Sequence, residues 1–587
     1  MLLTTAPESG PSLMVIEAGL AAIVFAASFA WPRLGSIWFS GIERGFGRLA
    51  RRKGLAVAVV GLTALLLRLA ILPLVPIPYP FSTDDFSFLL AADTFAHGRL
   101  TNPTPAMWTH FESIHITMQP TYMSMYFPAQ GLVMAAGKLL FGQPWFGILI
   151  SCALMCAAIC WMLQAWLPPA WALLGGVLAI LRLGLFSYWI NTYSGGGAIA
   201  ALGGALVLGA LPRLLKTARF RYGMLMAVGI VLLAGTRPYE GLLVCLPVLA
   251  VLGRWMFFEK NRPSTAVLMR RAALPLALIL AAGAWMAYYD YRAFGSPFIP
   301  PYAIARSTYA VAPYYIWQQV HPMPGYRHEE MRRFYAGSEL AGAMELHNLS
   351  GFLTEILKRI GASLAFFAGF ALLSPLMMLR RVLLDRRIRF LVLCLPVWTV
   401  GMMIGVFLVP HYLAPFTAAF YVIGLQAMRH LSFLKSGGWP AGRTMARLTV
   451  TLCLLMAGLR LYAEPLHLTP RQWPLGAWLC WWWGPGHFGA DRARIEAEME
   501  QLPGKQLILV RYTSKHEPMD EWVYNAADID GSKVIWAREM DAANNVDLIR
   551  YYKDRQVWLV EPDMQSEKVS PYPMPESGTA SPTKVAK

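Results

Sequence analysis

Long apolar segments are the feature that most limits how this chain can fold. Runs of about 17–25 apolar residues recur from Leu13 to Leu461, and each is long enough to cross a bilayer as a helix. Lipid offers the backbone no hydrogen-bond partner, so a spanning segment should be a helix. Barrel strands alternate polar and apolar residues, which these runs do not. The sequence therefore predicts an all-α polytopic membrane protein of about twelve transmembrane helices.

Basic residues indicate on which side of the membrane each loop lies. The 587-residue chain is only 14% charged, yet its net charge is +17. Its Lys and Arg residues gather in short clusters between apolar runs, which is typical of cytoplasmic loops and of contact with membrane lipid rather than with nucleic acid. The clusters lie at 44–53, 213–221, 260–271, 380–389 and 429–447.

Placing these clusters inside the cell puts both termini and the segments 78–126 and 291–355 outside. The apolar segment 127–141 is short for a crossing. A full crossing there would put the cluster at 213–221 outside. We therefore interpret 127–141 as a re-entrant or interfacial helix of the first outer loop.

The chain after residue 462 has a different character. Short buried strands are predicted at 505–512, 533–537 and 557–560, with a helix near 541–552. A tail rich in Pro, Ser, Thr, Glu and Lys follows and is predicted to be disordered. The expected organisation is an N-terminal span and basic loop (1–54), a transmembrane domain (55–462), an outer α/β domain (463–564) and the tail (565–587).

The first outer loop begins FSTDDFSFLLAADTFAHGRLTNPTP. Ser82 or Thr83 can cap a helix whose first turn holds Asp84 and Asp85, where the helix dipole favours carboxylates. This amphipathic helix could lie in the membrane interface. Two interpretations stay open: the acids carry chemistry, or they only stabilise the start of the helix.

The loop also resembles a known family. An acidic pair after the first core span, then LLAAxxxxxGRLTNPTP and PTYMSMYFPAQGLVMAAGKLLFGQPWFGILIS, is similar to the C-type membrane glycosyltransferases. The closest resemblance is to the branch of bacterial protein mannosyltransferase-like enzymes and lipid A aminoarabinose transferases. It covers roughly the first half of the chain.

The resemblance implies an enzyme of the bacterial inner membrane that takes a sugar from a polyprenyl-phosphate donor at the outer face. The acceptor would be a glycan, a lipid or a protein. By position, Asp84 would be the base that deprotonates the acceptor hydroxyl, and Asp85 would orient it or contact the sugar or a metal. Many members of the superfamily use a divalent metal, but this branch does not require one, so no cofactor is certain.

A lipid phosphate leaving group needs a cation, and Arg237 in TRPYEG fits this need because a guanidinium can hold two phosphate oxygens. Related enzymes often have Lys-Gly nearby, and this chain departs from that pattern. The alternatives are an ion pair of Arg237 with Glu240, or an arginine that reaches to the interface.

Further polar residues are candidates for substrate binding. His110, Glu112 and His115 in WTHFESIHI could bind a metal, but their spacing is not a recognised one. The favoured interpretations are that they line the sugar or acceptor pocket, or that they only occupy a solvated loop. His411 stands where related enzymes often have an Arg-Tyr pair. Tyr193 precedes three glycines at another outer turn, and glycines let the backbone approach a ligand closely.

The leading hypothesis is thus a membrane glycosyltransferase. The main alternative is a lipid-linked sugar flippase or another transporter, and a third is a ligase or polymerase that accepts whole glycan chains. Transporters often show internal repeats and interrupted helices at mid-bilayer. The sequence has no clear repeat, and its polar residues concentrate in outer loops, which favours the enzyme.

Overall fold

The computed structural model describes residues 12–260, 262–468, 488–564 and 568–573. Seven of the described helices are long and apolar enough to cross a membrane. They are α1 (Leu13–Ala30), α3 (Lys53–Ala70), α6 (Trp145–Trp166), α9 (Gly197–Thr217), α11 (Pro238–Phe258), α12 (Thr265–Phe294) and α20 (Ala441–Leu461). Three shorter apolar helices are α7 (Pro169–Ala179, extended to Gly184 by a π turn), α10 (Phe220–Ala234) and α18 (Arg389–Met403). The predicted helical, multi-pass fold class is confirmed, while the count of about twelve spans stays a prediction.

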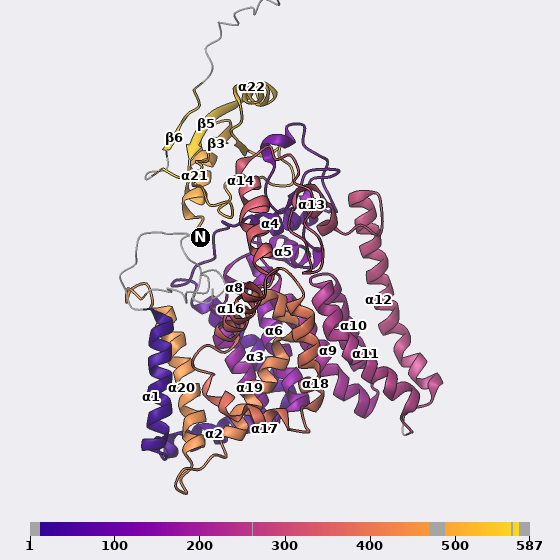
Figure 1. Ribbon diagram of the computed structural model, residues 1–587, viewed down its shortest axis with the longest axis vertical. Coiled ribbons are helices and arrows are strands. Elements are labelled where there is room, and N and C mark those ends of the chain that lie inside the picture. Colours follow the sequence, from indigo (N-terminus) through magenta and orange to yellow (C-terminus); the bar gives the residue numbers. More distant parts are fainter. Residues whose placement is uncertain (1–11, 261, 469–487, 565–567, 574–587) are drawn as a thin grey trace, which may run out of the picture.

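The remaining helices connect and cover this bundle. They are α2 (Ser36–Arg51), α4 (Thr83–Ala96), α5 (Pro128–Phe141), α8 (Tyr188–Asn191), α13 (Pro301–Tyr309), α14 (Glu329–Arg332), α15 (Glu339–Glu345), α16 (Leu349–Phe367), α17 (Leu379–Leu383) and α19 (Thr417–Leu431). Two basic helices, α2 and α17, lie at the end of the bundle opposite to the C-terminal sheet (Figure 1). This arrangement agrees with the separation of basic loops from the C-terminal unit that the charge pattern predicts.

The bundle is tightly packed where α9 meets the 3-10 turn Pro410–Phe416. An added Cβ at Gly204 of α9 would lie only 1.9 Å from the carbonyl oxygen of Pro415. Glycine is therefore required there to let the two backbones approach. This contact fixes the position of His411 and Tyr412 relative to α9, because both residues lie at the start of the same turn.

Helix α4 begins as the sequence predicts. Ser82 is the N-cap, and its side chain and that of Asp85 form a reciprocal capping box. However, the prediction that this helix lies in the membrane interface is wrong, because Phe86, Leu90 and most of its other residues are buried. The helix has no distinct polar and apolar faces, because α5 packs on one side of it and the C-terminal unit packs on the other.

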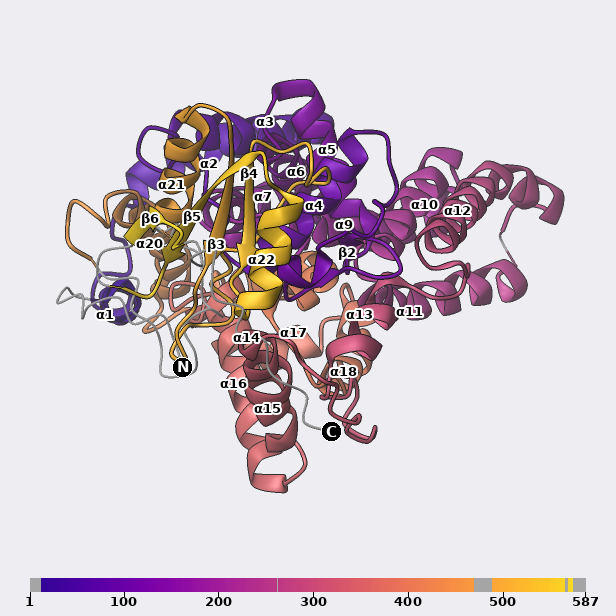
Figure 2. The same cartoon turned by 90° about the horizontal axis from the view of Figure 1, so that it is seen from above.

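The C-terminal unit has a four-stranded sheet in the order β4-β3-β5-β6. Its elements are α21 (Ala490–Gln501), β3 (Lys505–Val510), β4 (Val534–Arg538), α22 (Ala542–Tyr551), β5 (Arg555–Glu561) and β6 (Lys568–Pro571). The central β3 pairs in parallel with β4 and β5, and β6 pairs antiparallel with β5. The predicted strands and helix are confirmed. In the turn before β4, the Asp528 carboxylate accepts a hydrogen bond from Gly531 N at 3.1 Å. Seen from above, the sheet and α22 lie to one side of α4 (Figure 2).

The predicted disorder of 565–587 is wrong for β6, which completes the edge of the sheet. Its backbone hydrogen bonds with β5 outweigh the polar composition of the segment. Residues 565–567 and 574–587 lie outside the described residues. A further short hairpin in the first loop pairs β1 (Ile116–Thr117) with β2 (Met123–Ser124).

Candidate active site

Asp84 lies in the first turn of α4 with its side chain 26% exposed. The Tyr126 hydroxyl donates a hydrogen bond to Asp84 Oδ1, and His115 Nδ1 lies 2.9 Å from the same oxygen. Burial alone would raise the pKa of this carboxyl, but the charge of His115 and the hydrogen bonds from His115 and Tyr126 outweigh it and lower the pKa to about 2. Asp84 is thus an ionised and partly exposed carboxylate.

Asp85 points the other way and is fully buried. Its Oδ1 accepts from Tyr193 N at 2.9 Å, and its Oδ2 accepts from Ser82 N at 3.3 Å and Phe81 N at 3.4 Å. Burial raises the pKa of Asp85 to about 6, the negative charge of Asp84 adds to the rise, and these hydrogen bonds oppose it. For Asp85, the interpretation that the acid stabilises the start of the helix therefore holds. Asp85 caps α4 and connects it to the turn at Tyr193.

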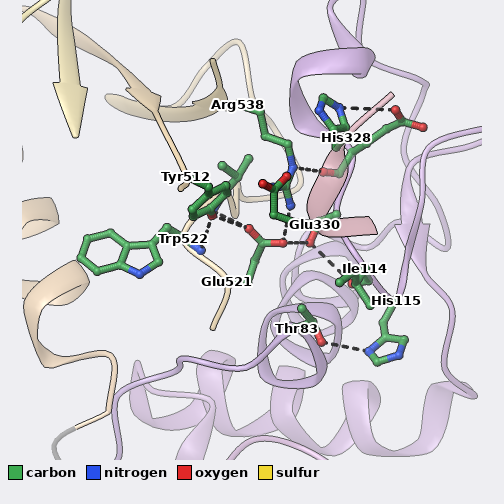
Figure 3. Close-up of polar contacts among 12 residues, drawn as sticks. Thr83, Ile114, His115, His328, Glu330, Tyr512, Glu521, Trp522 and Arg538 are labelled. Carbon is green, nitrogen blue, oxygen red and sulfur yellow. Dashed lines mark hydrogen bonds and ion pairs between the residues drawn. The ribbon is translucent and has the colours of Figure 1, made fainter. Parts of the chain in front are cut away.

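His115 is held in a backbone conformation that is unusual for its residue type. Its φ is +67°, and such left-handed geometry costs a non-glycine residue on the order of 1–3 kcal/mol. Its carbonyl accepts hydrogen bonds from Ser87 Oγ at 2.7 Å and Met125 N at 3.2 Å. Thr83 Oγ1 lies 3.0 Å from its Nδ1 (Figure 3). Surrounding contacts thus maintain the strained backbone that turns the imidazole towards Asp84.

Arg237 is the buried cation of the site, with a side chain only 6% exposed. One guanidinium nitrogen donates to Gly195 O at 3.0 Å, and the guanidinium lies 4.3 Å from the centre of the Tyr412 ring. Two neighbouring buried groups, Arg237 Nε and Thr236 Oγ1, have no hydrogen-bond partner in the described part of the chain. An unsatisfied buried donor costs about 1–3 kcal/mol, so this pair favours a site built to receive an anion.

The alternatives for Arg237 do not fit its surroundings. No ion pair within 4.0 Å joins it to Glu240, although both residues are described and Glu240 is buried beside it. Its low exposure also excludes a side chain that reaches out to the membrane interface. The charge is instead kept in place by a carbonyl and an aromatic ring.

The turn after Tyr193 connects these two parts. Gly195 has φ +83°, and an added Cβ would lie 2.8 Å from His411 Nδ1, so only glycine lets His411 pack there. His411 Nδ1 lies 2.9 Å from the Tyr188 hydroxyl. Burial and the charge of Arg237 lower the pKa of His411 well below its usual value, while Asp84 acts in the opposite direction. The pKa of His411 therefore depends on both charges of the site.

A cluster of aromatic side chains connects the acid to the arginine. The rings of Tyr126 and Tyr302 are 5.5 Å apart, and Phe127 stacks on Tyr302 at 5.7 Å. Tyr412 completes this set at the arginine. Sequence reasoning missed Tyr126, Tyr302 and Tyr412 as site residues, because aromatics are equally expected at a membrane interface.

Two predicted residues lie elsewhere. His110 contacts the C-terminal unit, with Nδ1 3.0 Å from Arg538 O and Nε2 3.2 Å from Asn544 O. Glu112 accepts a hydrogen bond from the Tyr309 hydroxyl at 2.9 Å. These contacts do not bring them to Asp84. Among the described residues no group of three or more His, Cys, Asp or Glu side chains could hold a metal ion.

Comparisons with known proteins give a fold likeness at low identity. No protein-family model and no curated protein match the chain. ArnT from Cupriavidus metallidurans in the apo state has a TM-score of 0.47 and 14% identity, over 86% of this chain and 93% of that one. The same protein bound to undecaprenyl phosphate has a TM-score of 0.46 and 13% identity, over 86% and 92%. The Archaeoglobus fulgidus oligosaccharyltransferase in complex with Zn and sulfate has a TM-score of 0.44 and 12% identity, over 86% and 67%.

At these identities and TM-scores, what the site of this chain does must be argued from its own residues.

Proposed function

We propose that this protein is a membrane glycosyltransferase that moves a sugar from a polyprenyl-phosphate donor to an acceptor hydroxyl at the outer face of a bacterial inner membrane. The observation that carries the proposal is the pairing of a partly exposed, ionised carboxylate with a buried, incompletely satisfied guanidinium on either side of a cluster of tyrosines. A transferase of this kind needs a proton acceptor at one end of its site and a phosphate anchor at the other.

The chemistry follows from these two ends. The acceptor oxygen bonds to the anomeric carbon while the bond from that carbon to the phosphate oxygen breaks. The acceptor proton passes to Asp84, which is positioned as a general base. The electron pair leaves with the polyprenyl phosphate, whose new negative charge is stabilised by Arg237 and the Thr236 hydroxyl.

The remaining predicted residues take supporting roles in this scheme. His115 holds Asp84 ionised, Tyr193 and Asp85 fix the turn that bears Gly195, and Glu240 and His411 lie beside the arginine. His110 and Glu112, predicted as pocket residues, have no part in it because they contact other elements. We propose no metal in the step. The gathering of basic helices at the end opposite to the sheet supports an outer position for the C-terminal unit.

The first experiment compares the wild type with Asp84→Asn in nanodiscs. Each protein receives a panel of radiolabelled undecaprenyl-phosphate sugars and a membrane extract as acceptor. Asp547→Asn on the exposed face of α22 is the matched control. We expect transfer by the wild type and the control but not by a folded Asp84→Asn protein.

The other outcomes are equally informative. Transfer that survives Asp84→Asn would remove Asp84 from the mechanism. No transfer and no donor binding by the wild type across the panel would refute the enzyme and favour the transporter. Binding without transfer would also favour a flippase that recognises the same lipid phosphate.

A further inference from the structure

A segment of the C-terminal unit, residues 519–527, runs along α4, and we call it the strap. At its start the strap meets the residues that precede Asp84. Asp520 forms an isolated antiparallel bridge with Ser82, Glu521 N donates to Phe81 O at 3.0 Å, and the Thr83 hydroxyl donates to Met519 Sδ at 3.5 Å. The backbone that leads into the proposed base is therefore held by a segment more than 400 positions away in sequence.

The contacts continue along the helix. The Tyr524 ring stacks on Phe86 at 4.6 Å with an interplanar angle of 21°. Ala527 N donates to Asp93 Oδ2 at 2.8 Å near the other end of α4. The strap thus follows α4 from its N-cap to its last turn, and this explains why the helix is buried on a side that the bundle leaves uncovered.

A buried ionic group anchors the strap to the sheet and to the loop before His115. Glu521 accepts hydrogen bonds from Arg538 at 2.7 Å, the Tyr512 hydroxyl at 2.9 Å and the Ser113 hydroxyl at 2.7 Å (Figure 3). Paired buried charges tolerate few geometries, because each carries a large desolvation cost. The group therefore fixes Ser113, two residues from His115, relative to the strap.

Arg237 is held differently. Its contacts are Gly195 and Tyr412, which belong to the transmembrane part of the chain. The proposed acceptor end, which the strap contacts directly, meets the proposed phosphate end through the turn after Tyr193, whose backbone N–H donates a hydrogen bond to Asp85. A change at Tyr524, which does not touch that turn, should therefore disturb the acceptor end more than the phosphate end.

We propose that the strap is a positioning element that sets Asp84 and His115 relative to the donor, so that the C-terminal unit is part of the machinery for transfer. This inference rests on the proposed function for its kinetic consequence, but its structural consequence can be measured without activity. Tyr524 is the residue we assign as the positioning contact, since its ring touches α4 two residues from Asp84.

The test uses the full-length protein with Tyr524→Ala, which removes the stack on Phe86, and Tyr524→Phe, which keeps it. Tyr551→Ala, on α22 and half-exposed, is a matched control in the same unit. Three quantities are measured for each folded variant: kcat, the affinity for undecaprenyl phosphate, and hydrogen exchange of the amides at 83–90.

We expect Tyr524→Ala to lower kcat by about 100-fold, as a displacement near 1 Å can do, and to speed exchange at 83–90. Its affinity for undecaprenyl phosphate should stay at the wild-type value. Tyr524→Phe and Tyr551→Ala should match the wild type in all three quantities.

Wild-type exchange at 83–90 in Tyr524→Ala would overturn the inference whether or not the protein proves to be a transferase. Loss of lipid affinity together with kcat would also overturn it, since that indicates general damage. If Asp84→Asn abolishes transfer but Tyr524→Ala keeps the wild-type kcat, the strap is refuted and the proposed function stands. If the wild type transfers nothing, the proposed function fails, and the exchange data alone decide whether the strap orders α4.

Discussion

The opposite surroundings of Asp84 and Asp85 predict opposite effects of pH on stability. Burial raises the pKa of Asp85 from 3.8 to about 6, whereas the contacts of Asp84 lower its pKa from 3.8 to about 2. A carboxyl with a raised pKa contributes stability that is fully present below pH 3.8 and is lost as the pH rises through 6. A carboxyl with a lowered pKa contributes stability that is present above pH 3.8 and is lost only as the pH falls through 2.

The magnitude follows from the shifts. About 2 pKa units at about 1.4 kcal/mol each give Asp85 a total loss of about 3 kcal/mol in the free energy of unfolding, of which about 2 kcal/mol falls between pH 4.5 and 7.5. Asp85→Asn removes this titration and keeps an oxygen that can accept from Tyr193 N. The unfolding temperature of the wild type, relative to this variant, should therefore fall by several degrees between pH 4.5 and 7.5.

The assay is thermal unfolding in nanodiscs, followed by intrinsic tryptophan fluorescence at five pH values from 4.5 to 7.5. Trp145 and Trp189 are fully buried and report on the helical bundle. Asp547→Asn, on the exposed face of α22, is the matched control. Because this change leaves Asp85 and its neighbours as they are, the unfolding temperature of that variant should run parallel to that of the wild type. Parallel curves for the wild type and Asp85→Asn would refute the assignment of Asp85 as a buried carboxyl with a raised pKa.

Three further predictions concern the anchor, the strap and the metal. Arg237→Lys should weaken binding of undecaprenyl phosphate about tenfold, because an ammonium cannot bond two phosphate oxygens from one planar group; an unchanged dissociation constant, measured with labelled lipid, would contradict the anchor. Arg538→Met leaves Glu521 buried without its cation and should cost about 3–5 kcal/mol of stability, whereas Arg550→Met on the exposed face of α22 should leave the unfolding temperature unchanged. Transfer should persist in excess EDTA, and activity that returns only when a divalent metal is added would show that a metal takes part.

The start of α4 was predictable because its signal is local. A capping residue, two acids and a hydrophobic run lie within a few positions of each other, and the structure has the helix there. The strands β3 to β5 were predictable for the same reason, since each is a short apolar run. The strand β6 was not, because its formation depends on the free edge of β5 rather than on its own polar composition.

The grouping of His110, Glu112 and His115 shows where local reasoning fails. The three lie within six positions, which favours a shared pocket. The φ of His115 is positive, and its imidazole faces Asp84 while His110 faces the sheet. Neither this local backbone geometry nor the strap, which contacts α4 across more than 400 positions, leaves a periodic pattern in the sequence.

The different roles of Asp84 and Asp85, in contrast, follow from a rule of helix capping that can be applied to the sequence alone. With Ser82 as N-cap, Asp85 is the third residue of the helix, and that position reaches back to the N-cap backbone in a capping box. Asp84 is one position earlier and is rotated by about 100° away from that contact, as the 3.6-residue period requires. A cap residue, one further residue and then two acids therefore predict that the second acid, at the third helical position, stabilises the helix and that the first remains available. The structure has this arrangement, which is why the proposed chemistry rests on Asp84 and the pH dependence of stability rests on Asp85.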